Sequence, residues 1–220
     1  MPLLRHAVWI ALLLAASFAV GGSPSSRPLD LPSGGRGVAE DEEETPESIQ
    51  FFGSIYEGDG FFFLLDKSGS MYGTKMAVLQ SEVMSSLAEL SEPSEFGIVA
   101  FSGDVQAYST APTPASSIAV STAQSWVEGL VPYGPTHMLG GAAQILTISQ
   151  LSTRASRSVI SVGDGLPNGP GPEQTLAGIL LLNTEDLPFH TILIGAGDGA
   201  AQFMSDLANL TGGTFRCVEL

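Results

Sequence analysis

Residues 61–70 read FFFLLDKSGS, an uninterrupted apolar run that stops at a group of small polar side chains. A short apolar run bounded by turn-forming residues is typical of a strand that is buried on both faces of a sheet. We therefore predict a strand over Phe61–Asp66. The polar residues after it fall in the loop beyond its carboxyl end, where doubly wound sheets bind their ligands.

Four further apolar runs alternate along the chain with segments whose apolar residues recur every three or four positions. Strands that alternate with amphipathic helices are typical of a mostly parallel sheet. The predicted strands are Phe61–Asp66, Phe96–Phe101, Ser158–Gly163, Phe189–Gly195 and Phe215–Val218. The predicted helices are Lys75–Leu90, Ile118–Leu130, Leu139–Ile148, Glu173–Leu182 and Ala201–Leu210.

A sixth strand is expected at Val105–Tyr108, because only Ser102-Gly103-Asp104 separates it from the strand before. Such a connection is too short for a crossover, so this strand must run antiparallel at the edge of the sheet. The predicted fold class is thus α/β: a doubly wound, mostly parallel sheet of six strands, with one antiparallel edge strand and helices on both faces.

Asp66, Ser68 and Ser70 occupy alternate positions of the first loop, and the glycine between the serines permits a tight turn. One carboxylate and two hydroxyls can thereby converge. Two more oxygen-bearing side chains are expected in neighbouring loops, Thr136 before a helix and Asp164 after a strand. Hard cations such as Mg²⁺ prefer oxygen ligands, so these five residues form a candidate metal site.

The five positions resemble the metal-ion-dependent adhesion site of the von Willebrand factor A (VWA) family, an Asp-x-Ser-x-Ser motif with a distant Thr and a distant Asp. Asp66, Ser68 and Ser70 match the motif, Thr136 the middle position and Asp164 the last. The resemblance assigns residues 53–220 to a VWA domain. It implies Mg²⁺, with Mn²⁺ or Ca²⁺ as alternatives, contacted by the serines and, in the ligand-bound form, the threonine, while the aspartates act largely through water.

The resemblance also implies what the site binds: an ion left with one free position takes a carboxylate from a protein partner. Lys67 lies inside the motif at a position that varies in the family, and Met71-Tyr72-Gly73 continue the loop; neither removes a ligand. Residues 50–53, QFFG, resemble a Phe-Phe-Gly segment of exported bacterial members and predict an added strand or a hydrophobic cover.

The N-terminal region differs in composition from the rest. Residues 1–21 combine a basic start with an apolar run and small residues, which is typical of a secretory signal peptide; an uncleaved anchor is the alternative and the one route to a membrane. Residues 22–52 are rich in Pro, Ser, Gly and acids and predict a disordered spacer. Its block Glu40–Glu44 leaves open a calcium-binding tail, although such blocks are usually only solvated. We expect an exported protein.

The net charge and the cysteine count exclude one class of partner and one kind of cross-link. The formal net charge is −15, and a field of that sign repels phosphate backbones, so nucleic acid is excluded as a partner. The single cysteine, Cys217, rules out an intramolecular disulfide, and we expect it to be buried on the last strand.

Catalysis has little support in the sequence. His137 is the histidine nearest the predicted site, His190 begins a predicted buried strand, and no Gly-x-Ser-x-Gly motif is present. We therefore predict a non-enzymatic protein that binds an acidic protein partner through a divalent metal. The alternative is a scaffold within an envelope complex, in which the metal mainly stabilises the fold.

Overall fold

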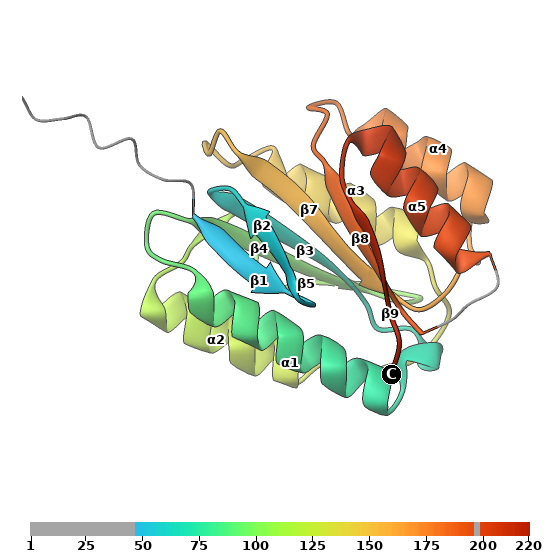
Figure 1. The fold of residues 1–220 in the computed structure, drawn as a ribbon, viewed down its shortest axis with the longest axis horizontal. Coiled ribbons are helices and arrows are strands. Elements are labelled where there is room, and N and C mark those ends of the chain that lie inside the picture. Colours follow the sequence, from blue (N-terminus) through green and yellow to red (C-terminus); the bar gives the residue numbers. More distant parts are fainter. Residues whose placement is uncertain (1–46, 196–198) are drawn as a thin grey trace, which may run out of the picture. The chain divides into compact units, whose positions relative to one another are not determined.

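The structure, a computed structural model, describes residues 47–195 and 199–220. Its main sheet contains the six predicted strands in the order β5-β4-β3-β7-β8-β9 (Figure 1). Four neighbouring pairs are parallel, and β5 runs antiparallel to β4 at the edge, as expected. The bounds are β3 Gly60–Asp66, β4 Glu95–Phe101, β5 Val105–Ala107, β7 Arg157–Gly163, β8 Phe189–Ile194 and β9 Phe215–Val218. A two-residue strand missed in the sequence, β6 Thr113–Pro114, also pairs with β4.

Helices cover both faces of the sheet, which confirms the predicted α/β class (Figure 1). One face carries α1 and α2, and the other carries α3, α4 and α5. Their bounds are α1 Thr74–Glu89, α2 Ser117–Glu128, α3 Met138–Ser149, α4 Pro172–Leu182 and α5 Ala200–Thr211. A short 3₁₀ helix, η1 Gly69–Met71, precedes α1. Along the described residues, no helix is long and apolar enough to cross a membrane.

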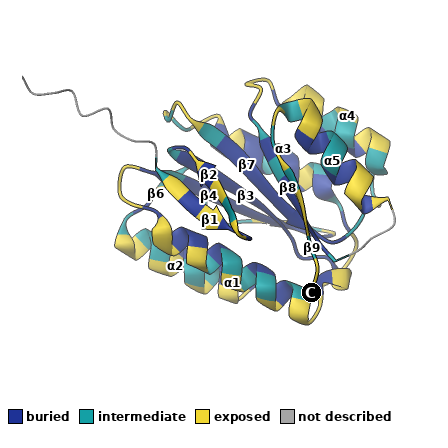
Figure 2. Cartoon of the chain, viewed as in Figure 1, coloured by how far each residue is buried: buried dark blue, intermediate teal, exposed yellow. Residues whose placement is uncertain are grey.

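The strand β3 explains why the sheet is central, because all seven of its residues are buried (Figure 2). Side chains alternate between the two faces of a strand. Phe61, Phe63 and Leu65 therefore join the core beneath α1 and α2, while Phe62 and Leu64 join the core beneath α3 to α5. An unbroken apolar sequence is what this two-sided burial requires.

A hairpin outside the main sheet corrects the predicted spacer. Strands β1 Ser48–Phe51 and β2 Ser54–Glu57 pair antiparallel, so residues 48–52 belong to the folded domain and the boundary at residue 53 was wrong. Their two-residue loop has positive φ at both positions, 48° at Phe52 and 70° at Gly53, the geometry of tight hairpin turns. The rest of the spacer and the signal segment lie outside the described residues.

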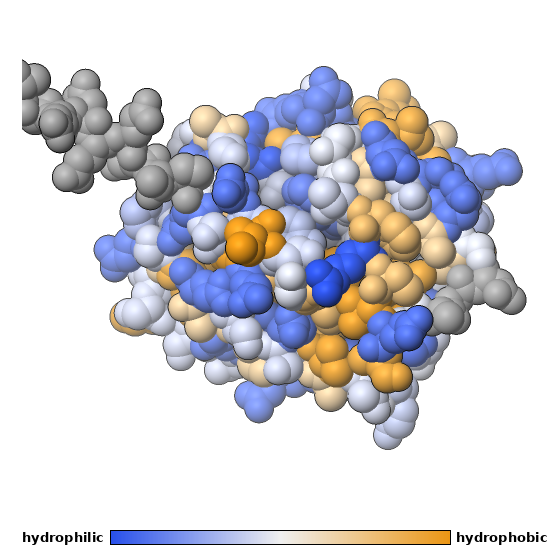
Figure 3. Space-filling model, in the orientation of Figure 1, coloured by the Kyte–Doolittle hydropathy of each residue, from blue (hydrophilic) through white to orange (hydrophobic). Residues whose placement is uncertain are grey.

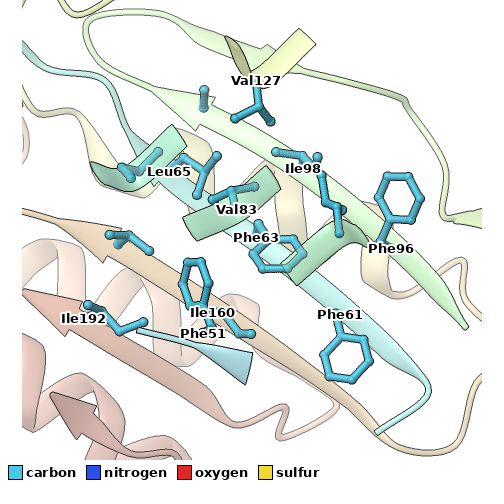
Figure 4. Packing of buried hydrophobic residues seen from close by; sticks show 14 of the residues in the cluster. Phe51, Phe61, Phe63, Leu65, Val83, Phe96, Ile98, Val127, Ile160 and Ile192 are labelled. Atoms are coloured by element: carbon cyan, nitrogen blue, oxygen red, sulfur yellow. The ribbon is translucent and has the colours of Figure 1, made fainter. Parts of the chain in front are cut away.

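The hairpin closes the face of the sheet beside α1. Phe51 is fully buried, and its ring lies 5.7 Å from that of Phe63 (Figure 4). Glu82 of α1 accepts a hydrogen bond from the Phe52 amide at 2.7 Å, and the Ser86 hydroxyl donates to the Gln50 carbonyl at 2.7 Å. The QFFG segment is thus both an added strand and a hydrophobic cover.

The expected burial of Cys217 was wrong, because its side chain is exposed. It lies on β9, which is the last strand of the sheet. An edge strand has a neighbour on one side only, so its side chains are less completely covered. On the face drawn in Figure 3, apolar residues are more numerous on the half that carries β9 and the C-terminus than on the opposite half.

Candidate metal centre

The loops after β3 and β7 begin side by side. The two strands are parallel neighbours, with Leu65 opposite Val162, which brings Asp66 level with Gly163 and places Asp164 just beyond. A Cβ atom on Gly163 would lie 3.1 Å from Asp66 Oδ2, so the glycine allows the carboxylate to approach the neighbouring backbone. Two carboxylates from residues almost one hundred positions apart are therefore brought to one edge of the sheet.

The Asp66–Ser70 loop folds its oxygen atoms toward one another. The Ser68 amide donates a hydrogen bond of 2.7 Å to Asp66 Oδ1, which turns the chain back over the end of the strand. The hydroxyls of Ser68 and Ser70 then lie 3.1 Å apart. Ser68 is buried whereas Ser70 is exposed, so the pair spans the distance from the sheet edge to the surface.

Asp164 completes a continuous network of four of the five predicted residues. The Ser70 hydroxyl donates to Asp164 Oδ1 at 2.7 Å. The second oxygen, Oδ2, lies 2.5 Å from the ammonium of Lys75 in the first turn of α1. The structure thus joins Asp66, Ser68, Ser70 and Asp164 by hydrogen bonds and close contacts.

Thr136 is held next to this network through its backbone. Its amide donates to Asn168 Oδ1 at 3.0 Å, and its carbonyl accepts from the Asn168 amide at 3.0 Å. Two residues earlier, the Gly134 carbonyl accepts from the Gly69 amide at 3.0 Å. Thr136 is 7% exposed, and among the described residues no hydrogen bond joins its hydroxyl to the other four. Its loop is nonetheless fastened to both loops that carry the aspartates.

A buried lysine, whose role the sequence did not reveal, fastens a third loop. Lys67 is 1% exposed, and its ammonium donates to Ser102 Oγ at 3.0 Å and to Asp104 Oδ1 at 2.7 Å. The same nitrogen lies 3.9 Å from the centroid of the Tyr133 ring. A buried ammonium is tolerated only when it is paired, so these partners fix the loops after β3 and β4 and the loop that leads to Thr136.

Asn168 is another residue that sequence reasoning missed. Nothing in its local pattern distinguishes it from an ordinary loop asparagine. Its side-chain carbonyl oxygen accepts from the Thr136 amide and its backbone amide donates to the Thr136 carbonyl, and these contacts form only because the fold brings the two loops together. The signal is therefore three-dimensional, and the Asp164-Gly165-Leu166-Pro167 sequence before it offers no hint of that contact.

The pKa values of two carboxyl groups near the site, Asp66 and Asp104, are shifted in opposite directions. Burial raises the pKa of Asp66 to about 6, and the nearby charge of Asp164 adds to this. By contrast, the hydrogen bond from Lys67 holds the pKa of Asp104 well below its usual range, with the Tyr133 hydroxyl contributing. Asp104 is thus already paired with Lys67, whereas Asp66 is a buried carboxylate whose charged form a bound cation would stabilise.

The donor set fits a hard divalent cation. All candidate ligand atoms are carboxylate or hydroxyl oxygens, the kind that Mg²⁺, Mn²⁺ and Ca²⁺ take. Within residues 47–195 and 199–220, no group of three or more His, Cys, Asp or Glu residues is arranged to hold a metal, so softer N and S ligation has no candidate there. The serine and threonine hydroxyls are what distinguish this centre from an all-carboxylate one.

The two histidines of the described residues, His137 and His190, are not part of this hydrogen-bond network. A Cβ atom on Gly169 would come within 2.6 Å of His137 Nε2, so that ring lies against the loop after β7. His190 is near the start of β8, at the other end of the sheet, where its Nδ1 accepts a hydrogen bond from the Thr214 amide and its ring packs on Tyr56. Across the described part of the chain, neither ring is hydrogen-bonded to Ser68, Ser70 or Thr136.

Comparisons with known proteins agree with this architecture. No family model matches the chain. Over 174 residues the chain is 26% identical to human von Willebrand factor A domain-containing protein 3B, a match that covers 76% of this chain and 12% of that protein. The chain thus spans a small part of the length of this relative.

Solved structures share the fold at low sequence identity. A von Willebrand factor type A structure from Catenulispora acidiphila matches with a TM-score of 0.67 at 20% identity, covering 75% of this chain and 40% of that chain. The pilus adhesin SpaC from Lactobacillus rhamnosus GG matches with a TM-score of 0.61 at 15% identity, covering 80% and 31%. The chain thus has the VWA fold, a mostly parallel sheet with one antiparallel edge and helices around it.

Proposed function

We propose that this chain binds a protein partner through a divalent cation held by Asp66, Ser68, Ser70, Thr136 and Asp164. The observation that carries the proposal is the network in which the hydroxyls of Ser68 and Ser70 lie 3.1 Å apart and Ser70 reaches Asp164 at 2.7 Å. These side chains come from separate loops, and within residues 47–195 and 199–220 no histidine is hydrogen-bonded to them. A convergent set of oxygens with an excess of negative charge favours ion binding.

The residues divide the work of the site. The two aspartates supply the negative charge. The hydroxyls of Ser68, Ser70 and Thr136 supply neutral ligands, which would not neutralise the positive charge of a bound ion. When bound, Mg²⁺ offers a position that an acidic side chain of a partner can fill. Ser70 is exposed whereas Asp66 is buried, so an ion held by both residues would be within reach of a partner at the surface.

Export and adhesion form part of the proposal. The apolar N-terminal segment is typical of a signal peptide, and SpaC, which shares the fold, is a pilus adhesin. Mn²⁺ and Ca²⁺ are the alternatives to Mg²⁺ because both accept the same oxygen ligands.

The test uses a short peptide rich in glutamate and its glutamine counterpart, with binding measured in Mg²⁺ and in EDTA. We expect the glutamate peptide to bind only with Mg²⁺, and the glutamine peptide not to bind. Thr136→Ala should abolish this binding, whereas Thr147→Ala, which removes a threonine hydroxyl on the exposed side of α3, should leave it intact.

The scaffold alternative gives a different result in the same experiment. If Mg²⁺ raises the melting temperature while neither peptide binds in any ion, the metal serves the fold and recognition through the metal is wrong. If the glutamate peptide binds equally well in EDTA, the site is not responsible for binding.

A further inference from the structure

Lys75 holds a position that the stability of its own helix does not explain. It is the second residue of α1, and a positive charge in the first turn is repelled by the helix dipole. Its side chain nevertheless turns toward the metal centre, and its ammonium lies 2.5 Å from Asp164 Oδ2. Asp164 is 1% exposed and Lys75 33% exposed as side chains, so the lysine covers the carboxylate from the solvent side.

The lysine stem is also accommodated by a neighbouring strand. A Cβ atom on Gly195, directly after β8, would lie 3.5 Å from Lys75 Cε and 3.9 Å from its nitrogen. The side chain thus crosses from α1 to the ends of β7 and β8. Because Ser70 already donates to Oδ1 of Asp164, both oxygens of this carboxylate have partners on the chain itself.

We infer that Lys75 is a built-in counter-cation that weakens metal binding at the site and makes the loaded site selective for acidic partners. This inference rests on the proposed function. Two carboxylates balance the charge of a divalent ion, so the nearby ammonium leaves the loaded centre with a net positive charge. That charge attracts a carboxylate from the partner and repels the ion itself.

Two measurable effects of opposite sign follow from this arrangement. Removing the ammonium lifts its repulsion of the ion, so the affinity for Mg²⁺ should rise by roughly tenfold, given a charge several ångströms away at a partly exposed site. Removing it also leaves the buried Asp164 without its cation, so the metal-free protein should melt at a lower temperature. An ordinary structural ion pair predicts the second effect without the first.

The experiment titrates Mg²⁺ calorimetrically into the full chain as wild type, Lys75→Gln and Lys75→Arg. We expect Lys75→Gln to bind Mg²⁺ roughly tenfold more tightly, and Lys75→Arg to stay near wild type because it keeps the charge. At saturating Mg²⁺, Lys75→Gln should bind the glutamate peptide several-fold more weakly. Melting in EDTA should place Lys75→Gln below the wild type.

Arg216→Gln is the matched control, because it removes one positive charge from β9, where Arg216 bonds to Ser54 of the hairpin. Its Mg²⁺ affinity should equal that of the wild type. Wild-type binding of Mg²⁺ with no gain in Lys75→Gln would overturn the inference and leave the proposed function standing. If neither wild type nor Lys75→Gln takes up Mg²⁺ or Mn²⁺ at millimolar concentration, both the inference and the proposed function are wrong.

Discussion

At the scale of single residues, the centre contains buried charged side chains, and each of them depends on neighbouring groups to offset the cost of its burial. Asp66 is 1% exposed and would be costly as a lone anion, but its carboxylate accepts a hydrogen bond from the Ser68 amide, and Gly163 leaves room for it because it has no side chain. Lys67 is equally buried and is balanced by Asp104. At this centre Asp104 pairs with Lys67 and Asp164 pairs with Lys75, whereas no ion pair to Asp66 is formed among the described residues.

The metal-free protein should lose stability as the pH rises, because of Asp66. Burial raises the pKa of this group from 3.8 to about 6, so the folded state binds the proton more tightly than the unfolded state. The stabilising contribution is complete below about pH 4 and is lost as the pH passes 6, up to about 3 kcal/mol. In EDTA at pH 7.5, Asp66→Asn should raise the free energy of unfolding by on the order of 2 kcal/mol, measured by urea denaturation.

Two comparisons check that prediction. At pH 4 the advantage of Asp66→Asn should disappear, because the aspartate is then protonated in the folded wild type. Asp206→Asn, at a half-buried position of α5 where Asp206 accepts a hydrogen bond from Gln202, should change stability little at either pH. An Asp66→Asn variant that is less stable than the wild type at pH 7.5 in EDTA would contradict this account of the buried carboxylate.

At the scale of elements, the adjacent carboxyl ends of β3 and β7 position the loops of the site, and α1 contributes Lys75, which contacts Asp164. The positions of β3 and β7 were predictable, because buried parallel strands have continuous apolar sequences that end at polar loops. The hairpin of β1 and β2 was not predicted as such, because its strands have four residues each and follow an acidic segment. Its burial depends on α1 and β3, which are remote in sequence.

The hairpin should contribute substantially to stability. Phe51 is fully buried, with its ring edge-on to Phe52 and Phe63, so Phe51→Ala should lower the free energy of unfolding by about 3 to 4 kcal/mol in urea denaturation. Ile55→Ala on the same hairpin serves as control, since Ile55 is 72% exposed and should cost little. Equal losses in the two variants would show that the hairpin does not pack on the sheet as described.

At the scale of the whole molecule, the sequence predicted the α/β class and the succession of strands and helices along the chain. Of the five residues proposed as metal ligands, the structure joins four in one network, which are Asp66, Ser68, Ser70 and Asp164. Thr136 was placed in the right loop, but its neighbour Asn168 was not foreseen. Lys67 and Lys75 were also unforeseen as contacts of the site, since pairing with Asp104 and Asp164 arises from tertiary structure rather than from spacing. The prediction that Cys217 is buried was wrong, because the exposure of a side chain on the edge strand β9 depends on what packs beside that strand.

The most direct test of the account is a titration of Mg²⁺ into the ¹⁵N-labelled chain, followed by NMR amide shifts. We predict saturable changes in three loops, at residues 66–71, 133–137 and 164–168, with the hairpin at residues 48–57 unaffected. The shifts should vanish in Ser70→Ala combined with Asp164→Asn. The absence of any shift at millimolar Mg²⁺, or shifts confined to the acidic block Glu40–Glu44, would contradict a metal centre at the end of β3 and β7.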